Sequence, residues 1–285
     1  MPASTLRALM VGDVVGEPGL AVLEARLPQI IKENSVDFTV VNGENAAAGF
    51  GMTDADLRRI LAAGADVVTS GNHVWEKRDF RPFLDSEERV LRPANYPLGN
   101  GDAKIPGRGW VKVQKAGDTW LVINLQGREH MTPIDCPFRC FDSIMENLSE
   151  GTNLVLVDFH AESAREKEAL AYYLDGRASL VVGTHTHVQT ADERVLPKGT
   201  GYITDLGMTG IIDSVIGMDP KICLDRVRKQ IQYRMEVAEV SGNVNKVPGQ
   251  TNSAAPPAKA VIQGIIAELD RDTGKTATVC RAHFY

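Results

Sequence analysis

The sequence predicts an α/β protein with a mixed β-sheet and helices packed on its outside. In the first half, short apolar runs at residues 6–11, 38–41 and 67–68 alternate with segments of helical spacing. Such alternation is typical of right-handed βαβ units that build a parallel sheet. Later in the chain, two pairs of apolar runs flank turn residues and indicate antiparallel hairpins. No change of composition divides the chain, so residues 1–285 are expected to form a single domain.

Two helices are expected between the first three strands. The first has apolar residues at helical spacing, namely Leu20, Leu23, Leu27, Ile30 and Ile31. The second follows Thr53 and Asp54, which are residue types that cap the amino terminus of a helix. Each helix therefore fits the crossover between two parallel strands.

The rest of the chain is expected to have a less regular order. Residues 81–106 are rich in proline, asparagine and charge and indicate a long ordered loop, and residues 241–257 indicate another polar loop. The remaining segments are predicted as hairpins at 110–113 with 120–125 and at 261–269 with 276–284, helices at 142–148, 162–174 and 220–231, and strands at 154–157, 180–182 and 202–203.

Metal-binding residue types follow five of the predicted strands, and four of the six histidines are among them. They are Asp13, the pair Glu44 and Asn45, the pair Asn72 and His73, His160, and the pair His185 and His187. Ligands of open α/β sheets bind outside the carboxyl ends of the strands. Histidine with carboxylate is a ligand set that hydrolytic metals prefer. The sequence therefore predicts a metal site at this end of the strands.

The number of candidate ligands predicts two metals that share a bridge. The candidates are Asp13, Glu44, Asn45, Asn72, His160, His185 and His187, which are too many for one tetrahedral site. Two cations about 3.5–4 Å apart can bind both the attacking and the leaving oxygen of a phosphoryl group. A carboxylate is the natural bridge because each of its oxygens can bind one metal. His185 and His187 are two residues apart and are expected to face the same side of an extended backbone.

Each of these residues also has a purely structural interpretation. Asp13 could cap a helix that follows the first strand. Asn45 and Asn72 could be turn residues. His160 taken alone could be a hydrogen-bonded histidine of the core. Glu44 is harder to explain in this way, because an acid that follows a buried run needs a partner.

Composition excludes several other classes of protein. The net charge of −6 argues against an extended nucleic-acid-binding surface, although bound cations would let an acidic protein bind a small phosphate ester. No apolar run approaches the roughly 20 residues of a membrane span. The first apolar run is too short for the core of a signal peptide, so a cytoplasmic protein is expected. The four cysteines are expected to be free thiols of a reducing compartment.

The order of these motifs resembles that of the calcineurin-like metallophosphoesterases. That superfamily usually has Asp-x-His, Gly-Asp-x-x-Asp, Gly-Asn-His-Asp/Glu, a single His and Gly-His-x-His. This chain departs at Val15, at residues 42–45 and at Val74. The departures match one branch, the YmdB-like phosphodiesterases. Further stretches that resemble this branch are residues 71–77, 92–97, 158–162, 183–192 and 204–210.

The resemblance implies a four-layer αββα sandwich with a dinuclear site. The metals would be iron or manganese, with zinc also open. One metal would be held by Asp13, Glu44, Asn45 and His187, and the other by Glu44, Asn72, His160 and His185. Glu44 would bridge the two. His73 would donate a proton to the leaving oxygen while a metal-bound hydroxide attacks phosphorus.

The activity implied is hydrolysis of small phosphodiesters, including 2′,3′-cyclic nucleotides. Two alternatives stay open: a phosphomonoesterase that uses the same site, and a regulatory nucleotide- or RNA-associated protein whose metal site is vestigial. A small phosphodiester or nucleotide is the expected partner, with no membrane. A homo-oligomer, the metal used and the physiological substrate are left open by the sequence.

Overall fold

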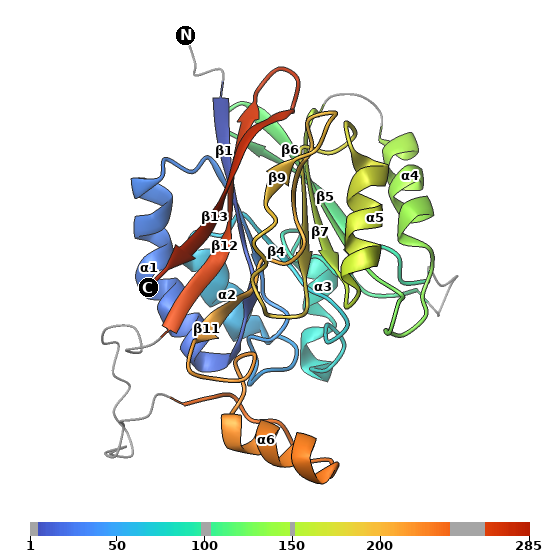
Figure 1. Ribbon diagram of the computed structural model, residues 1–285. Coiled ribbons are helices and arrows are strands. Elements are labelled where there is room, and N and C mark those ends of the chain that lie inside the picture. Colours follow the sequence, from blue (N-terminus) through green and yellow to red (C-terminus); the bar gives the residue numbers. More distant parts are fainter. Residues whose placement is uncertain (1–4, 98–103, 149–151, 240–259) are drawn as a thin grey trace.

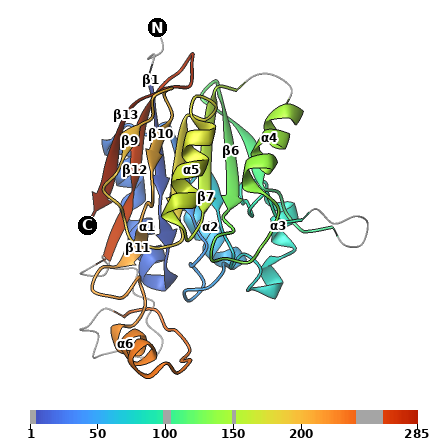
Figure 2. The ribbon, with the colours of Figure 1, turned by 45° about the vertical axis from the view of Figure 1, so that its right-hand side comes forward.

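The computed structural model describes residues 5–97, 104–148, 152–239 and 260–285 (Figure 1). Two β-sheets pack against each other, and helices cover their outer faces (Figures 1 and 2). The four-layer αββα order expected from the resemblance is therefore confirmed. The polar loop predicted at residues 241–257 lies outside the described residues.

The first sheet has seven strands in the order β2-β11-β12-β1-β3-β4, with β13 paired to β12. β1, β3 and β4 are parallel, as the βαβ pattern predicts. β12 runs antiparallel to β1 and makes the sheet mixed. The strands are β1 (Thr5–Val11), β2 (Asp13–Val14), β3 (Phe38–Asn42), β4 (Val67–Thr69), β11 (Met208–Ile211), β12 (Ala260–Asp270) and β13 (Thr276–Phe284).

The second sheet has six strands in the order β5-β6-β7-β8-β10-β9. β5 and β6 form the predicted hairpin, and β6, β7 and β8 are parallel. The strands are β5 (Trp110–Lys115), β6 (Asp118–Gln126), β7 (Leu154–His160), β8 (Leu180–Thr184), β9 (Arg194–Val195) and β10 (Gly201–Ile203).

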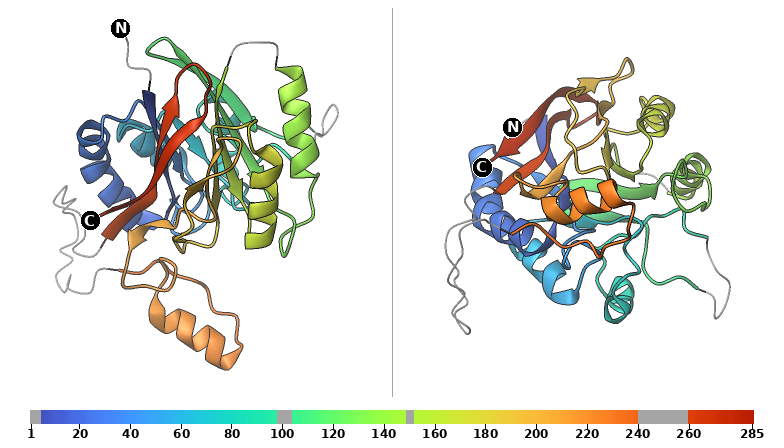
Figure 3. Two further views of the ribbon diagram at one scale, coloured as in Figure 1. Left: turned by 45° about the horizontal axis from the view of Figure 1, so that its top comes forward. Right: turned by 60° about the horizontal axis from the view of Figure 1, so that its bottom comes forward.

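The helices lie on the two outer faces, except for α6, which projects from the end of the sandwich (Figures 1 and 3). Thr53 caps α2 through a capping box with Asp56, which fixes where that helix begins. The helices are α1 (Gly16–Glu33), α2 (Asp54–Ala62), α3 (Phe83–Ser86), α4 (Pro137–Asn147), α5 (Ala164–Leu174) and α6 (Pro220–Lys229), with a 3-10 turn at Arg78–Phe80.

Both faces of β1 are buried, which explains why apolar and polar residues do not alternate along it. Leu9 and Val11 pack in the core formed with α1 and α2, whereas Leu6 and Met10 pack in the core between the sheets. Side chains alternate between the faces of a strand, so a strand with both faces buried needs apolar residues throughout. Stacking of Phe38 on Trp120 at 4.6 Å between ring centroids joins the two sheets.

Several predicted boundaries were wrong. The segment predicted as a long loop at 81–106 contains α3, a single turn too short to give a periodic pattern. α4 begins at Pro137 rather than at residue 142, because proline is tolerated in the first turn of a helix. Strands β2, β9 and β11 were not predicted, because β2 and β9 have only two residues each and Thr209 and Gly210 interrupt the apolar residues of β11.

No helix among the described residues is long and apolar enough to cross a membrane.

Candidate metal centre

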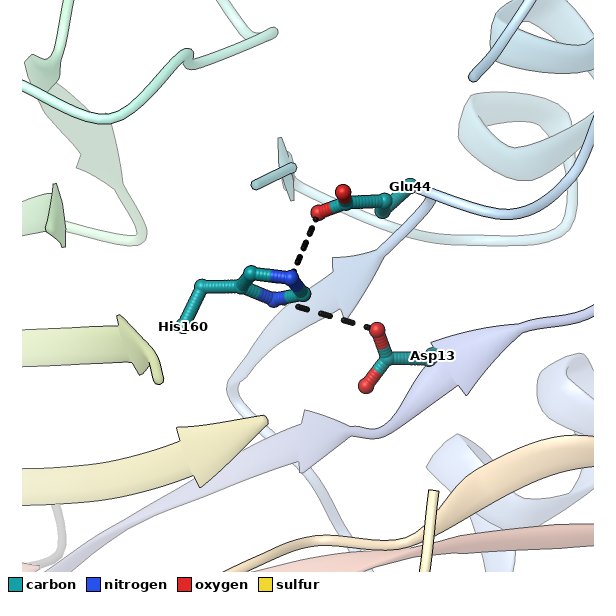
Figure 4. Close-up of side chains that lie close together, drawn as sticks. All are labelled: Asp13, Glu44 and His160. Atoms are coloured by element: carbon teal, nitrogen blue, oxygen red, sulfur yellow. Dashed lines mark ion pairs between the residues drawn. The ribbon is translucent and has the colours of Figure 1, made fainter. Parts of the chain in front are cut away.

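The candidate ligands meet where strands of both sheets end. Asp13 opens β2 directly after β1, Glu44 follows β3, and His160 is the last residue of β7 (Figure 4). One ligand atom from each of these three residues lies within 4.8 Å of the others, and all three residues are buried. Two side chains of the first sheet and one of the second thus face a common point.

The distances within this group are short. His160 Nε2 lies 3.0 Å from Glu44 Oε2, and His160 Nδ1 lies 3.9 Å from Asp13 Oδ1 (Figure 4). Such a group of two acids and a histidine in the interior is costly unless the charges are compensated. A bound cation would compensate them.

Four buried oxygens of the predicted ligands have no hydrogen-bond partner among the described residues. They are Asp13 Oδ1, Glu44 Oε2, Asn45 Oδ1 and Asn72 Oδ1. Leaving a buried acceptor unsatisfied costs about 1–3 kcal/mol, and more when it is charged. All four belong to predicted ligands, and hard oxygen donors suit divalent cations. The donor set therefore fits metal ions.

In three of these residues, the second polar atom of the side chain does have a partner. Asp13 Oδ2 accepts a hydrogen bond from the His185 backbone N–H at 3.2 Å. Glu44 Oε1 accepts one from the His73 backbone N–H. Asn45 Nδ2 donates to Gly49 O at 2.9 Å. Each contact holds a ligand side chain in place.

Hydrogen bonds behind His160 select its tautomer. Its Nδ1 lies 3.0 Å from Thr184 Oγ1, and that hydroxyl donates its proton to Asp158 Oδ1 at 2.7 Å. Thr184 can therefore only accept from His160, so Nδ1 carries the ring proton. The lone pair of Nε2 then faces Glu44. A neutral imidazole held in this way is a typical metal ligand.

His185 and His187 lie at the site, but the expected reason for it was wrong. Their backbones are not extended: φ is 99° at His185 and 63° at His187, both in the left-handed region. His187 Nε2 lies 3.8 Å from Asp13 Oδ1, while its Nδ1 contacts Ile216 O at 2.8 Å. His185 Nδ1 lies 3.0 Å from His160 Nε2. The bend at these residues, rather than a shared strand face, brings the His187 ring to Asp13 and the His185 ring to His160.

Thr186, between these two histidines, is anchored by a buried ion pair. Asp205 Oδ2 accepts from the Thr186 hydroxyl at 2.8 Å and from Lys167 Nζ at 2.7 Å. Both charged side chains are buried. Non-glycine residues at positive φ are strained and persist only when surrounding contacts hold them. Sequence reasoning missed this pair, although the position of Asp205 directly after a strand resembled that of the ligands.

Burial dominates the electrostatics of the centre. It raises the pKa of Asp13 and of Glu44 well above the usual range, and neighbouring carboxylates raise both further. Burial also lowers the pKa of His160 well below its usual range and raises that of Asp158 to about 6. Without cations the interior therefore disfavours charge on these groups. Bound cations reverse this and favour ionised carboxylates with neutral histidines.

His73 lies at the border of the buried group. Its side chain is 26% exposed, and its Nδ1 lies 3.5 Å from Glu76 Oε1. Burial lowers the pKa of His73, and Glu76 opposes this effect. The ring packs edge-on against Phe50 at 5.1 Å. Unlike the three buried side chains of Figure 4, His73 is partly open to solvent and has an exposed acid as its neighbour.

Asp13 does not cap a helix. The N-cap of α1 is Val15, and no side chain caps that end. The structural alternative for Asp13 was therefore wrong. Asn72 lies in a turn and Asn45 forms an isolated β-bridge with Val15, but each also keeps a buried amide oxygen without a hydrogen-bond partner among the described residues, which local structure does not explain.

Gly71 must lack a side chain for the centre to form. A Cβ atom there would overlap Glu44 Oε2 and the His160 ring. We expect Gly71→Ala to lower bound metal per protein and to destabilise the fold by about 1–3 kcal/mol, measured by elemental analysis and chemical denaturation. Gly210→Ala is the control, because its methyl group would meet the nearest atom at 3.4 Å. Full metal content in Gly71→Ala would contradict this packing.

Known proteins are similar to this chain in sequence and in fold. The family described as YmdB-like protein matches residues 9–261. The 2′,3′-cyclic-nucleotide 2′-phosphodiesterase of Bacillus subtilis (strain 168) is 44% identical over 253 residues, which cover 87% of this chain and 94% of that protein. A hypothetical protein of Thermus thermophilus with a known crystal structure is 38% identical, with a TM-score of 0.83 and coverage of 98% and 99%. A crystal structure of a novel phosphatase from Mycoplasma pneumoniae is 27% identical, with a TM-score of 0.85 and coverage of 98% and 93%.

The two-sheet sandwich and the acids and histidines at its strand ends define a metallophosphoesterase fold. Within that class, the chain belongs to the YmdB-like family. The predicted family, fold class and enzyme class, a phosphoric diester hydrolase, are thereby confirmed.

Proposed function

We propose that this protein is a dinuclear-metal-dependent phosphodiesterase that hydrolyses 2′,3′-cyclic nucleotides. The observation that carries the proposal is the buried group of Asp13, Glu44 and His160, together with four buried oxygens, on Asp13, Glu44, Asn45 and Asn72, that have no hydrogen-bond partner among the described residues. The activity named for the Bacillus subtilis relative supports the choice of substrate.

The proposed ligand sets share Glu44. Asp13, Glu44, Asn45 and His187 would hold one metal, and Glu44, Asn72, His160 and His185 the other. The contact of His160 Nε2 with Glu44 Oε2 at 3.0 Å and that of His187 Nε2 with Asp13 Oδ1 at 3.8 Å support this division. Iron or manganese is the proposed metal, since oxygen and imidazole donors suit both.

Two bound cations would supply the positive charge that neutralises the phosphoryl oxygens and acidifies an attacking water. The residues of the chain fix the geometry of the reaction. Backbone N–H groups hold Asp13 and Glu44 in place, so the carboxylates that would bind the cations are already positioned. Water adds to phosphorus, the bond from phosphorus to a ribose oxygen breaks, and that oxygen takes a proton.

His73 would provide this proton. Its ring is partly exposed beside the buried ligands, where a leaving oxygen can reach it, and Glu76 at 3.5 Å favours the protonated form. The product is a nucleotide with a single phosphomonoester. A phosphomonoesterase at the same site would instead continue to free phosphate.

Metal analysis followed by turnover assays tests the proposal. We expect the purified protein to bind two equivalents of Mn²⁺ or iron, and to hydrolyse a nucleoside 2′,3′-cyclic phosphate to the monoester without releasing phosphate. Faster cleavage of the monoester would favour the phosphomonoesterase. Metal binding without any turnover would favour a regulatory protein, and the absence of both would contradict the proposed enzyme.

A further inference from the structure

A second cavity shares His187 with the candidate metal centre. It has a volume of about 410 Å³ and lies at the edge of the first sheet, where residues of β12 and β13 meet the segments that follow His187 and β11. β11, β12 and β13 lie side by side there (Figure 1). The function proposed above assigns no role to this cavity.

The wall of the cavity combines polar and apolar side chains, and several of the apolar ones are open to solvent. Val188 is 59% exposed, Ile216 43% and Ile212 37%. Tyr285 lines the same cavity and is 67% exposed. Exposed aliphatic and aromatic side chains that gather in a hollow are typical of a ligand site, because a bound apolar group would remove them from water.

Three polar side chains of the cavity already have partners. The Gln189 side chain donates to two backbone carbonyls, at 3.0 and 3.1 Å. Gln263 Oε1 accepts from the Met208 backbone N–H at 2.9 Å. The Arg281 guanidinium pairs with Glu193 at 2.8 Å. The cavity therefore offers no uncompensated positive charge for a phosphate among its described residues and suits an uncharged, flat group.

The imidazole ring of His187 lies between this cavity and the candidate metal centre. One ring nitrogen, Nδ1, contacts Ile216 O at 2.8 Å, and the other, Nε2, lies 3.8 Å from Asp13 Oδ1. One five-membered ring thus separates the cavity wall from the candidate ligands. In a nucleoside cyclic phosphate, one five-membered ribose ring likewise separates the phosphate from the base.

We propose that this cavity binds the nucleobase of a cyclic nucleotide while its phosphate lies at the metal centre. The inference rests on the proposed function and assigns Ile212, Ile216 and Val188 to hydrophobic contact with the base. Because these contacts are apolar and the amide groups already have hydrogen-bond partners, we expect the cavity to bind different bases with similar affinity.

Two substrates that differ only in the base test this proposal. One is adenosine 2′,3′-cyclic phosphate, and the other is 1,4-anhydroribitol 2,3-cyclic phosphate, which has the same ribose and phosphate rings with a hydrogen in place of the base. We expect kcat/KM to favour the nucleotide in the natural protein. In Ile212→Asn this preference should fall about tenfold, mainly through KM, because apolar contact with the base is lost. Leu224→Asn on α6, at a side chain 54% exposed, is the matched control and should keep the preference.

An equal preference in Ile212→Asn and the natural protein would overturn the proposal, as would an equal fall in Leu224→Asn. Failure of the proposed function is a separate outcome, in which neither diester is hydrolysed. Calorimetric binding of adenosine then decides: binding that Ile212→Asn weakens supports the cavity, and no binding by the natural protein overturns it.

Discussion

Replacing Glu44 by glutamine should remove metal from the protein and lower kcat/KM for the diester by about 10³-fold or more, since ligand loss exceeds the 10–100-fold typical of residues behind the ligands. The glutamine is almost the same size and keeps one oxygen, so packing near Gly71 is retained. It has no charge, and its second terminal atom is a donor, so it cannot bridge two cations. Bound metal should therefore fall below two equivalents.

The stability of the metal-free variant distinguishes loss of a metal ligand from misfolding. The Glu44 carboxyl is buried and its pKa is raised by burial, so its charge opposes folding when no cation is present. Metal-free Glu44→Gln should therefore unfold at the same or a higher denaturant concentration than the metal-free natural protein. Glu24→Gln, which removes a surface pair with Arg59, is the matched control and should change neither metal content nor turnover. Two bound metals and normal turnover in Glu44→Gln would show that Glu44 is no bridge.

His73→Ala should lower turnover of the cyclic nucleotide by about 10²–10⁴-fold and leave metal content unchanged. The reason is that His73 would protonate a poor leaving group, a ribose oxygen, and would hold no metal. A diester with a nitrophenol leaving group needs little protonation and should lose much less. The measurements are kcat on both substrates and elemental analysis of the variant.

Each outcome for His73 has a distinct meaning. Loss of metal would make His73 a ligand. An equal fall in kcat for both leaving groups would indicate that His73 positions the phosphate instead of protonating the leaving oxygen. Glu76→Gln should have a smaller effect in the same direction, because Glu76 contacts His73 Nδ1 at 3.5 Å without reaching the buried group.

Local pattern predicted much of the fold. The buried strands, the two hairpins and the main helices each have a continuous signal of apolar spacing or turn residues, and the structure has them all among the described residues. Very short elements such as β2 and α3 had none. The spacing of apolar residues could not predict how the strands pair into two sheets, because partners such as β1 and β12 are far apart in the chain. The two-sheet arrangement was predicted from the resemblance to a family.

The site was predicted from the rule that ligands gather at the carboxyl ends of strands. The structure brings Asp13, Glu44 and His160 together as that rule requires. The turn at His185 and His187 could not be foreseen, because positive φ at a histidine depends on distant partners. The pair of Lys167 with Asp205, which holds Thr186 between the two histidines, is such a set of partners. Their chemistry is visible only once the strands are assembled.

Anomalous diffraction from crystals of the metal-loaded protein tests the central claim most directly. Data collected at the manganese and iron absorption edges locate each bound metal and identify it. We predict two peaks about 3.5–4 Å apart with one oxygen of Glu44 directed at each. A single peak, or two peaks that Glu44 does not join, would contradict the dinuclear centre.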